Sequence, residues 1–172
     1  MDDSVLVRLI REATESVFSV MLDLPIEAGP VERVVPTSDG YDGVIALVPL
    51  GGTIIGSGRL ICGARLACRI SSAMLMAEHT AVTEEVLDAV GELGNMIIGN
   101  VKTELESTEG PLALGLPTVI FGRNYHARSS AVREWLVVPF QCEEDRLEIH
   151  MFLAPAADRQ AGKPAHAVVH FD

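Results

Sequence analysis

Cysteines, aromatic residues and basic residues are all scarce in this sequence of 172 residues. The three cysteines, Cys62, Cys68 and Cys142, form no CxxC pair, which argues against a disulfide framework or a structural zinc site and indicates a reducing compartment. Lysine and arginine total 13 against 24 aspartates and glutamates, giving a net charge of −11. Because nucleic acid and anionic membranes both bind basic protein surfaces, neither is expected as a partner.

A long apolar segment and a basic N-terminus are also missing. The longest apolar stretch, around Val44 to Ile55, is interrupted by Pro49, Gly51 and Gly52 and is too short to span a bilayer. The first four residues (MDDS) lack the basic region of a signal peptide. We therefore predict a soluble cytoplasmic protein that does not enter the membrane.

The sequence has a glycine-rich segment and a pair of nearby histidines, but both lack the further residues needed for phosphate binding, nucleophilic catalysis or metal binding. Residues 51–58 (GGTIIGSG) lack the lysine of a phosphate-binding loop, so a hairpin turn is the preferred interpretation, and Ser57 lacks the flanking glycines of a nucleophile elbow. No glutamate lies between His166 and His170, and their context favours a strand, so they are not predicted to bind metal. We expect this chain to bind no metal or cofactor.

The hydrophobic periodicity predicts a mixed α/β (α+β) domain made of two similar halves. Each half runs helix, strand, strand, strand, and a further helix joins them. Val48-Pro49-Leu50 in the first half is mirrored by Val138-Pro139-Phe140 in the second. We expect one pseudo-symmetric domain over residues 1–153 and a tail over 154–172, whose end at 167–171 could add an edge strand. The predicted helices cover 4–24, 63–77 and 83–106, and the predicted strands cover 31–35, 41–50, 53–62, 117–121, 134–141 and 146–153.

The third predicted helix carries a continuous apolar stripe. At about 100° per residue, five large apolar side chains fall within about 80° of one another and are expected to be buried. Thr83 is expected to cap the helix, with acidic residues in the first turn, where they suit the helix dipole. Gly91 and Gly94 are explained by close packing against the alanine-rich second helix. The residues of the stripe are Val86, Val90, Leu93, Ile97 and Val101.

The opposite face of this helix carries Asp88, Glu92, Asn95 and Gly99 within about 60° of arc. A solvated face is the ordinary interpretation of such a pattern. Two features favour a functional surface instead. Asparagine is unfavourable inside a helix, because its amide competes for backbone hydrogen bonds. Glycine costs about 1 kcal/mol against alanine, and on this outward side it would permit another molecule to approach closely.

An exposed carboxylate and amide on a convex helix provide neither a nucleophile nor a histidine base. An amide can, however, hold a water and orient it for in-line attack, which is a part of phosphoryl transfer. A carboxylate can pair with a partner's lysine or arginine. Glu92 and Asn95, one turn apart, are therefore interpreted as half of an active site whose other half belongs to a phosphorylated protein.

These residues resemble the signature of the CheC/CheX/FliY chemotaxis phosphatase family. The pattern Asp-xxx-Glu-xx-Asn is present at Asp88, Glu92 and Asn95, within DAVGELGNMIIGNVK. The segment 114–120 (LGLPTVI) resembles the proline-containing strand start that follows the signature in the family. Between Asn95 and Pro117 lie 21 residues, one fewer than in the family pattern, which indicates a slightly shorter loop.

The resemblance implies a CheC-like fold, with long helices packed on one sheet, and dephosphorylation of a CheY-like response regulator. It implies that Asn95 orients the attacking water and that Glu92 pairs with the regulator's lysine. Asp88, Gly99 and Pro117 are assigned supporting roles. Mg²⁺ is expected on the receiver domain of the regulator and not on this chain.

The sequence predicts one such site per chain. The first predicted helix has Glu12-xx-Glu15 but no Glu-xx-Asn. CheC-like members have two such helices and CheX-like members have one, so the chain resembles the CheX group more closely, which implies a homodimer pairing through its sheets. The alternative is a non-catalytic adaptor that binds a response regulator or a flagellar-switch component. The presence of both Glu92 and Asn95 disfavours it, because a binding module does not need that pair.

Overall fold

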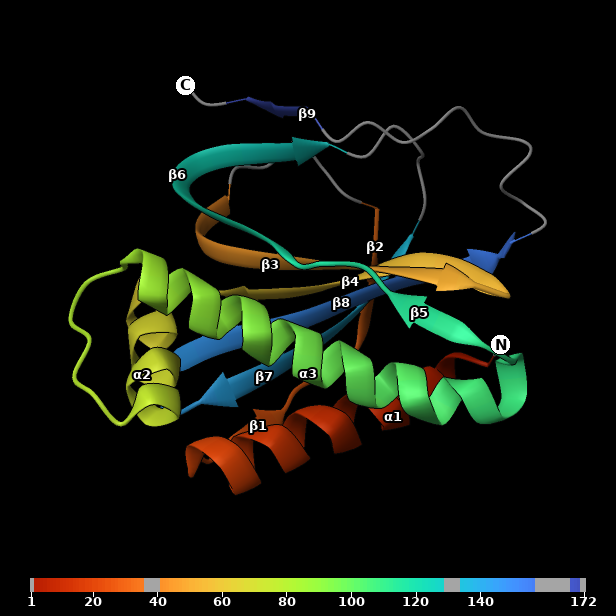
Figure 1. Cartoon of the computed structure of the whole chain (residues 1–172), viewed down its shortest axis with the longest axis horizontal. Coiled ribbons are helices and arrows are strands. Elements are labelled where there is room, and N and C mark those ends of the chain that lie inside the picture. Colours follow the sequence, from red (N-terminus) through yellow and green to blue (C-terminus); the bar gives the residue numbers. More distant parts are fainter. Residues whose placement is uncertain (1, 36–40, 129–133, 157–167, 171–172) are drawn as a thin grey trace.

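The computed structural model describes residues 2–35, 41–128, 134–156 and 168–170. Within these residues, the helices pack on one face of a mostly antiparallel sheet (Figure 1). The helical elements are α1 (Asp3–Val17), a π-helical turn η1 (Phe18–Leu22), α2 (Ala64–Leu75) and α3 (Glu84–Glu109). The strands are β1 (Glu27–Ala28), β2 (Glu32–Val34), β3 (Tyr41–Gly52), β4 (Ile54–Cys62), β5 (Leu112–Leu114), β6 (Thr118–Arg128), β7 (Trp135–Cys142), β8 (Asp145–Pro155) and β9 (Val168–His170).

The sheet has the two-half symmetry predicted from the order of elements. β4 and β8 pair at its centre, β3 and β7 flank them, and β6 and β2 pair with β3 and β7 respectively. The mirrored tripeptides occupy equivalent places in β3 and β7. The carbonyl of Pro49 accepts a hydrogen bond from the Gly115 N–H, and that of Pro139 accepts one from the Gly29 N–H, both at 2.8 Å. The predicted pseudo-symmetric α/β fold is confirmed.

The hydrophobic core lies between the sheet and the helices. All five residues of the predicted stripe on α3 are fully buried. They belong to one cluster with apolar side chains of β3 and β4, among them Val44, Ala46, Val48 and Leu60. Burying a Val, Leu or Ile side chain contributes about 1.5–3 kcal/mol, so this face of α3 is firmly attached and the opposite face is left outward.

Several element boundaries differ from the prediction. Gly51 and Gly52 belong to β3 and the turn follows at Thr53; Gly52 has a φ of +135°, a conformation that glycine adopts without strain. The first helix becomes π-helical at Phe18 and ends at Asp23, whose φ is 51°. The three-residue strand β5 is too short to give a recognisable sequence pattern.

The tail predicted to start at residue 154 begins within β8, which ends at Pro155. Residues 157–167 lie outside the described part of the chain. β9, which falls in the segment where an edge strand was expected, pairs with β6. No helix among the described residues is long and apolar enough to cross a membrane.

Candidate functional site

The side of α3 that faces away from the core carries Asp88, Glu92 and Asn95. Asp88 and Glu92 are exposed, and Asn95 is half-buried. Within the described part of the chain, none of these three side chains makes an ion pair or hydrogen bond. A carboxylate and an amide one turn apart are therefore both free to bind a water or a partner.

The ends of α3 are defined by Thr83 and Gly110. Thr83 is extended (φ −114°, ψ 175°), and its carbonyl accepts a hydrogen bond from the Leu87 N–H at 3.0 Å. Thr83 is the helix cap that the sequence predicts, although its side chain makes no capping hydrogen bond. Glu84 and Glu85 in the first turn suit the helix dipole. Gly110 ends the helix with a φ of +85°.

Gly91 and Gly94 pack against the sheet, so the expectation that they pack against α2 is wrong. A Cβ atom built on Gly94 would lie 3.2 Å from the Cβ of Ala46, and one built on Gly91 would lie 2.9 Å from the Cγ2 of Val119. The two glycines therefore let α3 lie close to β3 and β6. The alanine-rich composition of the second helix does not determine which neighbour α3 meets.

The chain between β5 and β6 runs alongside α3 (Figure 1). Val119 meets the helix at Gly91, and Leu114 meets it at Gly99, where a built Cβ would lie 3.4 Å from the Leu114 Cδ1. The intervening segment, which includes the half-buried Pro117, therefore passes Asn95. We call this boundary between α3 and residues 114–119 the seam. Gly99 is half-buried beside Leu114, which corrects the expectation that it faces open solvent.

Two anchors hold the chain at the end of the seam next to β5, and sequence reasoning identified neither. A Cβ on Gly115 would lie 2.5 Å from the Cγ of Pro49, so glycine is required there. Glu106 accepts hydrogen bonds from the Lys102 Nζ at 2.7 Å and from the Leu112 N–H at 3.0 Å, and these two bonds lower the pKa of its carboxyl group. The i,i+4 spacing indicates the pair of Lys102 with Glu106, but the bond to Leu112 depends on tertiary structure.

The described part of the chain provides no activated thiol and no metal cluster. All three cysteines are free and buried, and burial raises the pKa of Cys62 to about 12, so its thiol stays protonated. No group of three His, Cys, Asp or Glu side chains among the described residues could hold a metal ion. His166 and the side chain of His170 lie outside the described part.

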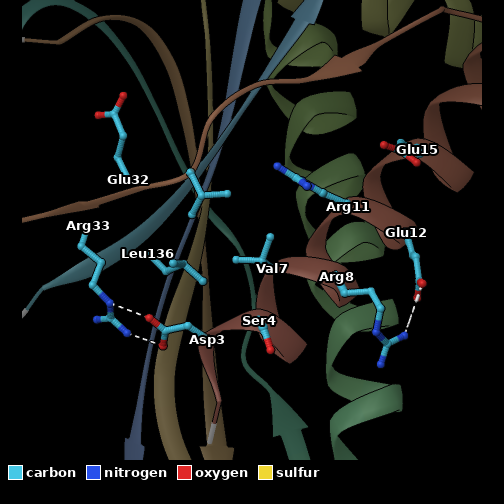
Figure 2. A pocket seen from close by; sticks show the side chains of 11 residues that line it. Asp3, Ser4, Val7, Arg8, Arg11, Glu12, Glu15, Glu32, Arg33 and Leu136 are labelled. Atoms are coloured by element: carbon cyan, nitrogen blue, oxygen red, sulfur yellow. Dashed lines mark hydrogen bonds and ion pairs between the residues drawn. The ribbon is translucent and has the colours of Figure 1, made fainter.

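An open groove of about 660 Å³ lies between α1 and residues 31–33, which include the start of β2. In Figure 2, charged side chains line it and bond with one another, including Arg33 with Asp3 and Arg8 with Glu12. Val7 and Leu136 add apolar surface. It lies beside β2, which pairs with β7 as β6, beside the seam, pairs with β3.

The first helix, α1, contains no asparagine or glutamine that could match Asn95. Aligning the buried residues of α1 at 9, 13 and 17 with those of α3 at 93, 97 and 101 matches Arg8 with Glu92 and Arg11 with Asn95. A shift of one turn matches Glu12 and Glu15 with them instead. Arg8 bonds Glu12 at 3.0 Å, and Arg11 donates to a backbone carbonyl at 3.0 Å. The α1 face therefore has no amide to orient a water, which supports a single site per chain.

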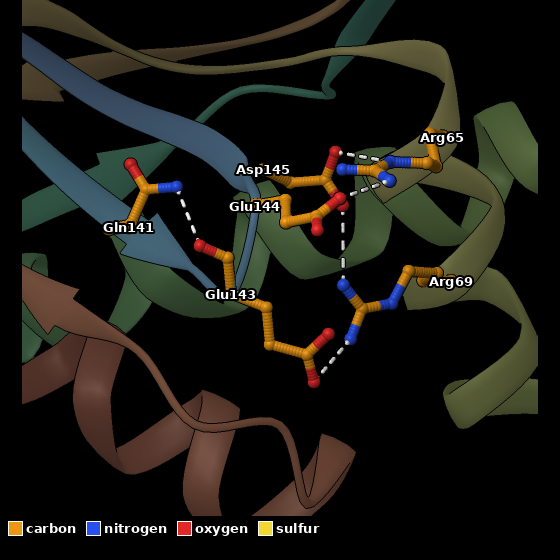
Figure 3. A network of polar contacts seen from close by, with 6 residues as sticks. All are labelled: Arg65, Arg69, Gln141, Glu143, Glu144 and Asp145. Atoms are coloured by element: carbon orange, nitrogen blue, oxygen red, sulfur yellow. Dashed lines mark hydrogen bonds and ion pairs between the residues drawn. The ribbon is translucent and has the colours of Figure 1, made fainter.

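A second charged cluster, missed by sequence reasoning, joins α2 to the turn between β7 and β8 (Figure 3). Asp145 accepts hydrogen bonds from the Arg65 Nε at 2.8 Å and the Arg69 Nη1 at 3.2 Å, and Glu143 and Glu144 pair with the same arginines. Because every charge here has a partner of opposite sign, the cluster attaches α2 to the sheet and leaves no free group for chemistry. The pattern is hidden in the sequence because Arg65 and Asp145 are 80 positions apart.

Comparison with known proteins agrees with the fold. The family described as chemotaxis phosphatase CheX matches residues 44–141, which include all of α3. The CheY-P phosphatase CheX of Thermotoga maritima is 30% identical over 109 residues, covering 63% of this chain and 70% of that protein.

Solved structures of CheX proteins share the fold. A chemotaxis protein CheX from Desulfovibrio desulfuricans matches with a TM-score of 0.77 at 22% identity, over 87% of this chain and 99% of that chain. A CheX in complex with CheY, BeF3 and Mg²⁺ from Borrelia burgdorferi matches with a TM-score of 0.67 at 22% identity, over 86% of this chain and 96% of that chain. Because the family match extends over more than half of its length, the chain belongs to the chemotaxis phosphatase CheX family.

Proposed function

We propose that this protein hydrolyses the phospho-aspartate of a CheY-like response regulator, with Asn95 orienting the attacking water and Glu92 docking on a lysine of the regulator. The observation that carries the proposal is the free carboxylate and free amide, one turn apart, on the outward face of α3. The CheY-P phosphatase of Thermotoga maritima and the CheX–CheY complex of Borrelia burgdorferi support the choice of substrate.

The proposed chemistry is divided between two proteins. The amide of Asn95 can accept one hydrogen bond and donate others, so it can fix a water in line with a phosphoryl group. The phosphoryl group and the Mg²⁺ that balances its charge are expected on the regulator. With this division, the chain itself needs neither a nucleophile nor a bound cofactor, and it acts in the cytoplasm, where the regulator is expected.

The decisive test is the decay of a phosphorylated CheY-like regulator from the same genome, measured with Mg²⁺ in the presence and absence of this protein. Asn95→Ala should lower the acceleration about 100-fold, equivalent to about 2.7 kcal/mol of transition-state stabilisation, with the fold intact. Asn100→Ala is the matched control, because Asn100 is an exposed asparagine on a different side of the same helix.

Two other results of this decay assay would contradict part or all of the proposal. Acceleration that persists in Asn95→Ala would keep the phosphatase activity and refute the role of Asn95. Equal decay with and without the protein, across several candidate regulators, would instead favour the non-catalytic adaptor.

A further inference from the structure

Asn95 lies at the edge of the seam and not on the most exposed side of α3. It is one turn from Gly91, on the side of the helix that faces β6, and it is half-buried whereas Glu92 is exposed. A molecule that reaches the amide of Asn95 must therefore also approach the segment that contains Pro117. The separation between α3 and this segment is consequently part of the site.

One close contact, between Gly91 and Val119, sets that separation. A Cβ on Gly91 would lie 2.9 Å from the Val119 Cγ2, whereas apolar atoms in ordinary contact are about 4 Å apart. Val119 has little freedom to turn away, because a β-branched side chain has few rotamers and its backbone pairs with Ala46 in β3. A methyl group at position 91 would therefore move α3 and β6 apart by about 1 Å.

We propose that Gly91 is a positioning residue: by admitting Val119, it holds the amide of Asn95 at the distance from residues 114–119 that a docked regulator requires. This proposal rests on the proposed phosphatase function. Displacements of about 1 Å can cost up to about 100-fold in rate, so we expect Gly91→Ala to lower kcat at least about tenfold. KM should change less, because Glu92 keeps its exposed position for docking. The loss would not reflect a weakened helix, since alanine favours a helix more than glycine does.

The test is a double-mutant cycle with the neighbouring side chain. Val119→Ala alone keeps the glycine and removes the side chain that a methyl group at position 91 would meet, so its kcat is the reference for the double variant. The double variant Gly91→Ala/Val119→Ala has space for the methyl group, so its kcat should lie within about threefold of that of Val119→Ala. A double variant as slow as Gly91→Ala would overturn the proposal, as would a Gly91→Ala variant with wild-type kcat.

A second measurement does not depend on catalysis. The side-chain amide signal of Asn95 in a ¹H–¹⁵N spectrum, assigned by its loss in Asn95→Ala, should move in Gly91→Ala and return toward its wild-type position in the double variant. If the wild-type protein accelerates no regulator, the proposed function fails, and this signal alone decides whether Gly91 positions Asn95. If Gly91→Ala does not fold, Val119→Ile adds bulk from the strand side and should produce the same displacement; an unmoved signal there would overturn the proposal.

Discussion

Glu92 and Asn95 differ in depth, and this difference separates their proposed roles. Glu92 is exposed and Asn95 is half-buried. In the proposed complex, the partner would therefore meet the carboxylate of Glu92 first and would reach Asn95 by docking along the seam. A charge in an exposed position contributes mainly to association, and its contribution is screened by salt. An amide that holds a water contributes to the chemical step.

We therefore predict that Glu92→Ala raises the KM for the phosphorylated regulator about tenfold, equivalent to about 1.4 kcal/mol of binding, and changes kcat little. The KM of the variant should also depend less on ionic strength than that of the wild-type protein. Steady-state turnover at low and high salt measures both effects. Glu104→Ala removes another exposed carboxylate of α3 and should leave both constants unchanged. A fall in kcat at constant KM would contradict a docking role for Glu92.

At the scale of elements, α3 was predictable on its own, but its surroundings were not. Its cap at Thr83 and its stripe from Val86 to Val101 follow from local residue preferences and helical periodicity, which the sequence contains directly. The contacts of Gly91 with Val119 and of Gly99 with Leu114 depend on which strand lies beside the helix. No local pattern specifies that neighbour, so the seam emerged only with the tertiary structure.

The link between α3 and β5 through Glu106 gives a prediction with a defined pH dependence. Hydrogen bonds from Lys102 and from the Leu112 N–H hold the pKa of Glu106 below its ordinary value of 4.5. A carboxyl group whose pKa is lowered on folding stabilises the protein above its unfolded pKa, and this contribution is lost as the pH falls through its folded pKa. Glu106→Gln should therefore lower the thermal midpoint at neutral pH.

The difference between wild type and Glu106→Gln should shrink below about pH 4.5 and vanish in more acidic solution, where the wild-type carboxyl group is also neutral. Thermal unfolding followed by circular dichroism across this range measures it. A difference that stays constant with pH would show that the charge of Glu106 is not what holds β5 to the helix.

At the scale of the whole molecule, the two halves share a backbone arrangement but differ in the side chains on their outward helix faces. The two halves have the same strand pairing and the same proline–glycine contact, yet α3 carries Glu92 and Asn95 whereas α1 contains no asparagine or glutamine. The fold therefore constrains the backbone of both halves alike, while the outward face of each helix is free to differ. The two-half order of elements was predictable from the sequence because strand order is encoded in short hydrophobic runs.

We also propose that the protein is a homodimer that pairs through its sheets, as the resemblance to CheX-like proteins implies. In the described part of the chain, β9 pairs with β6 at residues 126–128, and the strand residues before them have no outer neighbour. Backbone groups on such an edge are able to pair with another chain. Light scattering should give a mass twice the 18.4 kDa of one chain. A mass of one chain at micromolar concentration would contradict the dimer.

The central position of the β4–β8 pair has a consequence for how the molecule assembles. Its register joins Cys62 to Leu147 and Ile54 to Pro155. Forming the first of these pairs closes a loop of about 85 residues, and the chain entropy lost in that closure is recovered only as the ladder extends. The middle of the sheet is therefore a late, long-range event, and a nascent chain that has produced only its first half holds β4 as an open edge until β8 arrives.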